Sequence, residues 1–401
     1  MTIIITLLYL LSFLLIWQFV GYPSLMAIVA LRAKKSKPKN KDYSFQPFVS
    51  VIVPTYNEEK VIGKRIENLL ALDYPKSKYE IIVVDSDSTD NTAQVVEDII
   101  RQSSKPTLKL VREEERRGKA SAINFGKAHA RGDIVLITDA NTLFDKDVLR
   151  ELAPHFEDIK VGGVGGKYVV SNPNSALASS ESFYWYIEVI MREGEAHLDS
   201  ACTFHGEINA WRKNLVTVDA KMLTEDLDIA VQIKRAGYKV DYEPNAIAYE
   251  PSAITVGEQI KQRKRTSIGT IQCIFKYLNY FLLPRDLYSL LIFPSHKVLP
   301  MFSPFILLAI PNLYILAWNT KILITHFVLT LLVFMGLLVF LIYLKSKLTR
   351  EEEIESSLSI SSILKIVYYV VLNEYLILLA WKDFIFRKYS VLWEKAESTR
   401  V

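Results

Sequence analysis

The sequence predicts a doubly wound α/β domain carried by transmembrane α-helices. Apolar residues are concentrated at both ends of the 401-residue chain, and the middle alternates short Val/Ile-rich runs with helical patterns. With 50% hydrophobic and 23% charged residues, the chain is more apolar than one ordinary soluble domain. Residues 32–293 have the mixed composition of a domain that buries its own core. We therefore expect a membrane enzyme with one globular unit.

Charge and cysteine content exclude several classes of protein. The formal net charge of +4 is small, and the basic residues lie beside apolar segments, which favours a membrane surface over nucleic acid as the partner. No nucleic-acid-binding motif accompanies them. Cys202 and Cys273 have no CxxC or Cys/His spacing, so neither a disulfide framework nor a zinc site is indicated. A reducing compartment fits this pattern.

The N-terminal segment 1–31 is expected to span the membrane. It contains no charged residue before Arg32, and a span needs about 20 apolar residues. A cleaved signal peptide is disfavoured because a positive n-region is missing and the apolar run is too long. The basic linker 32–46 follows directly, and positive charge beside a span marks the cytosolic side. We expect a multi-pass protein of the cell membrane with its catalytic domain in the cytosol.

Three further segments are expected to contact membrane lipid. Charged and apolar residues mix over 259–296, a pattern typical of amphipathic interface helices. Two uncharged runs predict a transmembrane hairpin at 297–345, which is followed by a charged cytosolic loop at 346–359. The last segment, 360–381, contains Lys365, Asn373 and Glu374, so a transmembrane and a re-entrant helix both stay open, as does the side on which the tail 382–401 lies.

The soluble domain, 47–258, shows the alternation of a parallel sheet. Short apolar runs predict strands at 48–54, 80–85 and 133–138. Apolar residues at helical spacing predict helices at 58–72 and 92–101. In such sheets ligands bind beyond the carboxyl ends of the strands. Thr55, Asp85 and Asp139 fall there.

A glycine-rich run at 161–170 (VGGVGGKYVV) invites comparison with phosphate-binding loops. It has neither the Walker spacing nor GxGxxG. We favour a strand in which glycines permit close approach of neighbouring backbone.

Seven short motifs follow one another through the domain and just beyond it. They are VPTYNE at 53–58, VDSDSTDNT at 84–92, RGKASAIN at 117–124, TDAN at 138–141, FHGEINAWR at 204–212, LTED at 223–226 and QRKRT at 262–266. In this order, over residues 47–276, they resemble the family 2 glycosyltransferases, the inverting membrane-bound group that includes cellulose, chitin, hyaluronan and poly-N-acetylglucosamine synthases. The resemblance implies a Rossmann-like nucleotide-diphospho-sugar transferase (GT-A) domain and a nucleotide-sugar donor, with UDP the expected nucleotide.

The resemblance assigns the donor site to the first four motifs. The residues it implies for the nucleotide are Pro54, Thr55, Tyr56, Glu58, Asp85, Lys119, Asp139 and Asn141. Asp85 would accept a hydrogen bond from the base, and Lys119 at a helix N-terminus would face the diphosphate. Asp139 would hold Mg²⁺ or Mn²⁺, because such cations commonly use one or two carboxylates plus substrate phosphates. Asn141 replaces the family's second carboxylate, so its direct ligation is in doubt.

The resemblance assigns acceptor and catalysis to the remaining motifs. Gly206 and Glu207 would place the acceptor, and Asp226, beside Glu225, would take the proton of the acceptor hydroxyl. Arg265, with Gln262 and Arg263, would stabilise the departing diphosphate. Thr266 stands where the family has the tryptophan that helps line the acceptor site. This substitution weakens the prediction of processive polymer extension.

Taken singly, several motifs also fit structural roles. The 53–58 turn fits helix caps, Lys119 a solvated charge, and Thr224 with its following acids an ordinary helix start. Asp90 fits a cap better than a ligand. The expected function is inverting transfer from a UDP-sugar to a glycan or lipid-linked acceptor at the cytosolic face. The alternatives are a polyprenyl-phosphate sugar transferase, which ordinarily lacks the last two motifs, and a non-catalytic glycan-export or scaffold subunit.

Overall fold

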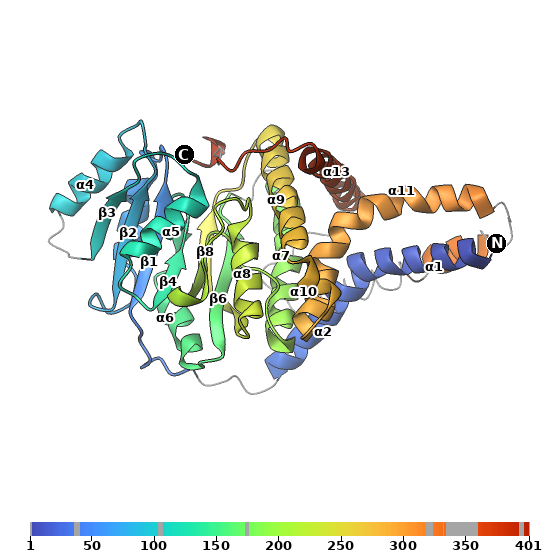
Figure 1. Ribbon diagram of the computed structural model, residues 1–401, viewed down its shortest axis with the longest axis horizontal. Coiled ribbons are helices and arrows are strands. Elements are labelled where there is room, and N and C mark those ends of the chain that lie inside the picture. Colours follow the sequence, from blue (N-terminus) through green and yellow to red (C-terminus); the bar gives the residue numbers. More distant parts are fainter. Residues whose placement is uncertain are drawn as a thin grey trace.

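The computed structural model describes residues 2–35, 41–102, 107–172, 176–317, 324–331, 333, 360–392 and 397–400. A sheet-containing domain lies at one end, and apolar helices project from the other (Figure 1). We call α1 (Thr2–Ile16), α11 (Leu299–Ala317) and α13 (Ile360–Ile385) the membrane-side helices. α1 and α11 run side by side away from the domain.

The described residues form one mixed sheet of eight strands in the order β3-β2-β1-β4-β7-β6-β8-β5. The strands are β1 (Val49–Thr55), β2 (Tyr79–Asp85), β3 (Leu108–Arg112), β4 (Ile134–Ile137), β5 (Leu143–Phe144), β6 (Val161–Val170), β7 (Asn209–Arg212) and β8 (Lys239–Glu250). β3, β2, β1 and β4 are parallel, whereas β7 is antiparallel to both β4 and β6. The three predicted strands are confirmed as β1, β2 and β4.

Helices cover both faces of this sheet. They are α3 (Ile62–Leu70), α4 (Thr92–Gln102), α5 (Lys119–His129), α6 (Val148–Leu152), α7 (Ala176–Leu198) and α8 (Glu225–Arg235). Val51 and Val53 of β1 join the core under α3 and α6, whereas Ile52 joins the core under α5 and α8. Burial of both faces explains why the strands are near-continuous apolar runs. The helix predicted at 58–72 is shorter, because its first residues form a turn.

The glycine-rich run forms β6, as predicted, and lies between β7 and β8. A Cβ at Gly163 would lie 2.7 Å from Cζ of Phe204, and one at Gly166 would lie 2.5 Å from the carbonyl oxygen of Ala246. Glycine at these positions therefore lets neighbouring side chains and backbone approach β6 closely. This packing accounts for the glycines without a phosphate-binding role.

Within the residues that the structure describes, two continuous helical stretches are long and apolar enough to cross a bilayer. They are Thr2–Lys34, with a mean hydropathy of 2.4, and Tyr288–Leu316, with 1.8. The first continues through η1 (Trp17–Gly21) into α2 (Tyr22–Lys35), which packs against α7. The C-terminal part of the predicted span 1–31, from Tyr22 onward, thus packs on the sheet domain and does not project from it. The second half of the predicted hairpin lies mostly outside the described residues, and spanning by α13 stays a prediction.

The segment predicted to be amphipathic is helical. It forms α9 (Val256–Lys276) and α10 (Leu278–Leu282), with Ile268, Ile271 and Ile274 buried. On the other side, Lys264 pairs with Asp383 of α13 at 2.7 Å, and Phe275 stacks on Phe384 at 5.6 Å between ring centroids. α9 therefore connects the sheet domain to the membrane-side helices.

Candidate active site

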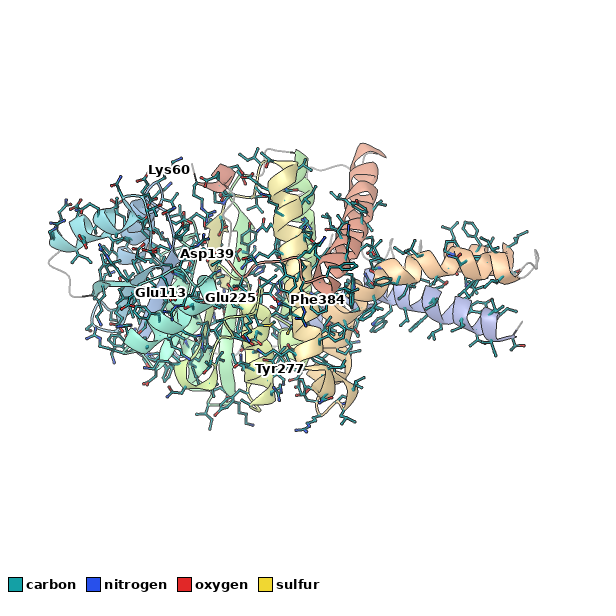
Figure 2. All side chains as sticks on the ribbon, turned by 45° about the horizontal axis from the view of Figure 1, so that its top comes forward. Lys60, Glu113, Asp139, Glu225, Tyr277 and Phe384 are labelled. Carbon is teal, nitrogen blue, oxygen red and sulfur yellow. The ribbon has the colours of Figure 1, made fainter. Side chains whose placement is uncertain are left out.

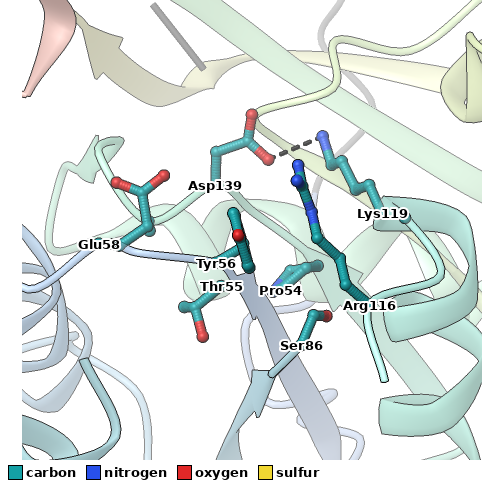
Figure 3. Close-up of a pocket in the computed structure, with 10 residues that line it drawn as sticks. Pro54, Thr55, Tyr56, Glu58, Ser86, Arg116, Lys119 and Asp139 are labelled. Carbon is teal, nitrogen blue, oxygen red and sulfur yellow. Dashed lines mark ion pairs between the residues drawn. The ribbon is translucent and has the colours of Figure 1, made fainter. Parts of the chain in front are cut away.

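A pocket lies beyond the carboxyl ends of β1, β2 and β4, where a doubly wound sheet is expected to bind its ligand. It is lined by Pro54, Thr55, Tyr56, Glu58, Ser86, Arg116, Gly118, Lys119, Asp139 and Ala140 (Figure 3). Six of the residues predicted to bind the nucleotide are among them. Ser86 and Arg116 were not predicted.

The turn after β1 forms one wall of the pocket. Thr55 is buried, and its hydroxyl donates to the carbonyl oxygen of Val84 at 2.9 Å. The guanidinium of Arg116 lies 3.7 Å above the ring centroid of Tyr56, a cation–π contact that fixes the ring. This wall offers an aromatic face and a positive charge, which together suit a nucleotide.

Asp85 ends β2 just behind this wall. It is only 4% exposed, and no described residue donates a hydrogen bond to its Oδ1. Burial raises the pKa of Asp85, although a hydrogen bond from Ser88 opposes the rise. A buried carboxylate oxygen with free acceptor capacity suits a ring N–H. Asp90 accepts from the backbone N–H of Thr92 at 2.9 Å, as expected for a cap.

Lys119 links the pocket residue Asp139 to Glu225 at the start of α8. Its Nζ lies 2.7 Å from Oδ1 of Asp139 (Figure 3) and 2.9 Å from Oε1 of Glu225. Figure 2 labels the two carboxylates, Asp139 and Glu225. Burial disfavours its charge, but the two carboxylates outweigh burial and raise the pKa of Lys119. A Cβ on Gly206 would lie 3.7 Å from the same nitrogen. The geometry contradicts the alternative of a solvated lysine.

The start of α8 presents two acids of different character. Burial and the neighbouring charge of Glu225 raise the pKa of Asp226 to about 6. Burial also opposes ionisation of Glu225, but Lys119 and then Arg265 outweigh it and lower the pKa of Glu225. One acid is thus a fixed negative charge, and the other is poised to exchange a proton near neutral pH.

Close packing, and not a cap, holds this helix start. Thr224 occupies the N-cap position, yet its hydroxyl has no hydrogen-bond partner among the described residues. A Cβ at Gly269 of α9 would lie 2.6 Å from Oγ1 of Thr224 and 2.8 Å from its backbone nitrogen. The absence of a side chain at Gly269 lets α9 lie directly against the N-terminus of α8. The alternative that Thr224 serves as an ordinary helix cap is not supported, because its hydroxyl makes no capping hydrogen bond.

Arg265 faces the same acids from α9. Burial lowers the pKa of Arg265, and the charges of Glu225 and Asp139 oppose that effect. Its Nε has no acceptor among the described residues, so it can donate to a diphosphate oxygen. Gln262 and Arg263 do not line the pocket as described. Arg263 donates to Asn373 of α13 at 2.9 Å.

Further charged groups surround Asp139, and of these only Glu207 was identified from the sequence. Burial, followed by the charges of Glu250 and Asp139, raises the pKa of Glu207 well above its ordinary value. Burial and the charge of Asp139 raise the pKa of Glu250 to about 7. Arg65 is fully buried behind them and donates to Oγ1 of Thr138 at 2.6 Å. Arg400 reaches Glu58 from the far end of the chain. None of Arg65, Glu250 and Arg400 belongs to a recognisable motif.

The donor atoms around Asp139 fit a hard divalent cation that arrives with a diphosphate. No group of three or more His, Cys, Asp or Glu among the described residues is arranged to hold a metal by itself. The side chain of Asp139 is 15% exposed, and the buried amide oxygen of Asn141 has no donor among the described residues. Oxygen ligands of this kind suit Mg²⁺ or Mn²⁺ completed by phosphates.

Two family models match the chain. The model described as "Glycosyl transferase family group 2" matches residues 134–381, more than half of the chain. The model described as "Glycosyl transferase family 2" matches residues 50–215. Together they cover the pocket, the α8 start and α9.

Curated relatives and a solved structure agree with these matches. The poly-beta-1,6-N-acetyl-D-glucosamine synthase of Staphylococcus aureus (strain COL) is 30% identical over 55% of this chain and 54% of its own length. The probable glycosyltransferase YdaM of Bacillus subtilis (strain 168) is 29% identical over 59% and 58%. The chain thus spans little more than half the length of the curated relatives it matches. A mannosyltransferase from Pyrobaculum calidifontis, solved with GDP-Man and Mn²⁺, is 24% identical with a TM-score of 0.68, covering 96% of this chain and 100% of that one.

Proposed function

This chain belongs to glycosyl transferase family 2, and on that premise we propose that it transfers a sugar from a UDP-sugar to a glycan or lipid-linked acceptor, with inversion, at the cytosolic face of a membrane. It is a glycosyltransferase, and its fold is the GT-A-like fold of nucleotide-sugar transferases. This excludes the non-catalytic subunit considered from the sequence. The donor, the acceptor, the stereochemistry and the membrane topology are the proposed parts.

One observation carries the proposed mechanism. Lys119 bridges Asp139, on the donor side, to Glu225, whose neighbour Asp226 is partly buried and has its pKa raised to about 6 by desolvation and by the charge of Glu225. A donor diphosphate near Asp139 and an acceptor hydroxyl near Asp226 would therefore be adjacent. Proximity of this kind turns a bimolecular step into an effectively unimolecular one.

The proposed step is a single displacement. Asp226 accepts the proton of the acceptor hydroxyl, the oxygen forms a bond to the anomeric carbon, and the bond from that carbon to the diphosphate oxygen breaks. The electron pair leaves with UDP, and the donor hydrogen atoms of Lys119 and Arg265 stabilise the growing negative charge. When bound, a divalent cation held by Asp139 supplies further positive charge against the diphosphate.

The proposed membrane setting follows from the two apolar helical stretches and from their packing. Residues 2–21 extend beyond the part of the first stretch that packs on α7. Twenty residues at about 1.5 Å each reach about 30 Å, the thickness of a bilayer core. The acceptor would meet the pocket from the side of α9.

A sugar-nucleotide screen tests the proposed function. Purified protein with Mg²⁺ or Mn²⁺ is given UDP-glucose, UDP-N-acetylglucosamine, UDP-galactose and GDP-mannose, and both nucleotide release and product mass are read. We expect UDP release and an oligosaccharide or glycolipid product. A polyprenyl-phosphate monosaccharide would support the alternative transferase, and release from GDP-mannose alone would overturn the UDP assignment.

The variant Asp226→Asn tests the catalytic assignment. It keeps the shape of the side chain but removes the base, so we expect transfer to fall by about 10²–10⁴-fold while UDP affinity stays within about twofold of that of the unaltered protein. Glu157→Gln, an acid on the surface of the same domain, serves as the control. Unchanged turnover of Asp226→Asn would remove Asp226 as the base.

A further inference from the structure

The turn after β4 lies against the end of β8. β5 pairs antiparallel with β8, with Leu143 opposite Tyr249. This register brings Thr142 beside Glu250, and the Thr142 hydroxyl donates to Oε2 of Glu250 at 2.7 Å. The 139–142 turn, which carries Asp139, is therefore tied to a carboxylate that is more than 100 residues further along the chain.

Asn141 lies within this turn with an unused ligand atom. The residue is 8% exposed, and its Oδ1 has no hydrogen-bond donor among the described residues. A buried amide oxygen without a donor is costly unless a ligand completes it. It can contribute a neutral oxygen to a hard cation, but it cannot contribute the negative charge of a second carboxylate.

Glu250 can supply that charge, and the charges of Arg400 and the fully buried Arg65 act on it without forming an ion pair. Within the described part of the chain, no Lys, Arg or His nitrogen lies within 4.0 Å of its carboxylate. Lys119 is engaged by Asp139 and Glu225, and Arg400 by Glu58. Buried carboxylates are normally paired or coordinate metals. A metal–nucleotide complex would bring a cation to this carboxylate.

We propose that Glu250 supplies the second carboxylate of the metal–diphosphate site, the role that Asn141 cannot fill. The inference rests on the proposed function, because the metal arrives with the nucleotide. Asp139, Glu250 and the amide oxygen of Asn141 would hold the ion, and the second acid would come from β8 and not from the turn.

The test measures metal binding and not turnover. Free Mn²⁺ is followed by electron paramagnetic resonance in titrations with UDP present and with UDP absent. Glu250→Gln keeps the hydrogen bond from Thr142 and removes only the charge, so we expect Mn²⁺ affinity with UDP to fall by about 10- to 100-fold. Tyr249→Phe, one residue away, is the control and should bind Mn²⁺ as the unaltered protein does.

A compensating variant makes the test specific. Asn141→Asp in the Glu250→Gln background returns a carboxylate to the turn, and we expect affinity to recover to within about threefold of the unaltered protein. Asn141→Asp alone should raise Mn²⁺ affinity without UDP. Melting temperatures of all variants separate lost binding from lost folding.

The outcomes distinguish this inference from the proposed function. If Glu250→Gln binds Mn²⁺ with UDP normally while Asp139→Asn does not, Glu250 is not a ligand and the proposed function stands. If no recovery follows from Asn141→Asp, Glu250 acts elsewhere and the inference is overturned. If the unaltered protein binds no Mn²⁺ with UDP, both the inference and the metal-dependent mechanism fail.

Discussion

Arg400 forms a buried, two-pronged ion pair with Glu58, 342 residues away in sequence. Its Nε and Nη2 each donate at 3.0 Å, to Oε2 and Oε1 of the carboxylate. Glu58 is 2% and Arg400 4% exposed. Ser398 fixes the same segment by donating to Glu258 of α9 at 2.6 Å. The 397–400 segment therefore lies against a wall of the nucleotide pocket, near the C-terminal label in Figure 1.

Arg400→Gln should weaken nucleotide binding. It leaves the carboxylate of Glu58 buried without its partner in the pocket wall, where it would repel a diphosphate. We expect UDP affinity to fall by about tenfold, which is about 1.4 kcal/mol, in isothermal titration calorimetry. The double variant Glu58→Gln/Arg400→Gln should recover most of the loss. Lys388→Gln, which removes an exposed charge from the same tail, is the control, and an equal loss there would show that only net charge matters.

The rate of transfer should depend on the protonation of Asp226. The carboxyl acts as a base only when it is unprotonated, and its pKa is raised to about 6. We expect kcat/KM to be constant above about pH 7 and to fall about tenfold per pH unit below about pH 6. The pKa of Glu250 is about 7, so the profile is also recorded in Glu250→Gln. An inflection that disappears in that variant would contradict the assignment to Asp226.

Gly269→Ala should separate α9 from the start of α8. The added methyl group would lie 2.6 Å from Thr224 side-chain atoms and 2.8 Å from a backbone nitrogen that cannot move aside freely. We expect kcat to fall by at least about tenfold, because a small displacement of catalytic groups is expensive. Gly257→Ala in the same helix meets nothing within 4 Å and is the matched control. Equal activity of the two variants would show that the close contact is not required.

Lys119→Met should destabilise the protein in a pH-dependent way. It leaves the buried carboxylate of Glu225 and the partly exposed carboxylate of Asp139 without their shared cation, and breaking a buried pair costs about 3–5 kcal/mol. Lys119 is the strongest charge that lowers the pKa of Glu225, so without it burial would raise that pKa above its unfolded value and the folded state would bind protons more tightly. The deficit should therefore be largest near pH 8 and shrink as the pH falls toward 5.

The measurement for Lys119→Met is the melting temperature at both pH values. Lys60→Met, an exposed lysine at the rim of the same domain, is the control (Figure 2). A deficit of the same size at both pH values would indicate that Lys119 contributes packing and not charge.

Local patterns predicted the elements that are buried on both faces. β1, β2 and β4 are recognisable as Val/Ile-rich runs, whereas β7 (NAWR) and β5 (LF) are too short and too mixed to stand out. The pairing of β5 with β8 joins residues about 100 positions apart, and nothing in either segment signals the partner. Long-range pairing was therefore the part of the fold that the sequence did not predict.

The same division applies to the site. Pro54, Lys119 and Asp139 were predicted from motifs at strand ends and helix starts, and they line the pocket. Glu250 and Arg400 reach the site only because a strand register and a returning tail bring them there. Arg263 belongs to a recognisable motif and donates a hydrogen bond to Asn373 of α13, so its role toward the diphosphate stays a prediction.

The crossing of α2 and α7 has a consequence for how substrate is handled. Gly194 leaves no room for even a methyl group against the carbonyl oxygen of Met26, and the hydroxyl of Tyr22 donates to Glu195 at 2.6 Å. The entering helix α2 and α7 are thus packed closely against each other. In the proposed topology this packing holds the pocket at a fixed height above the bilayer. Each transfer must then be followed by movement of the acceptor, since the enzyme cannot swing to meet it.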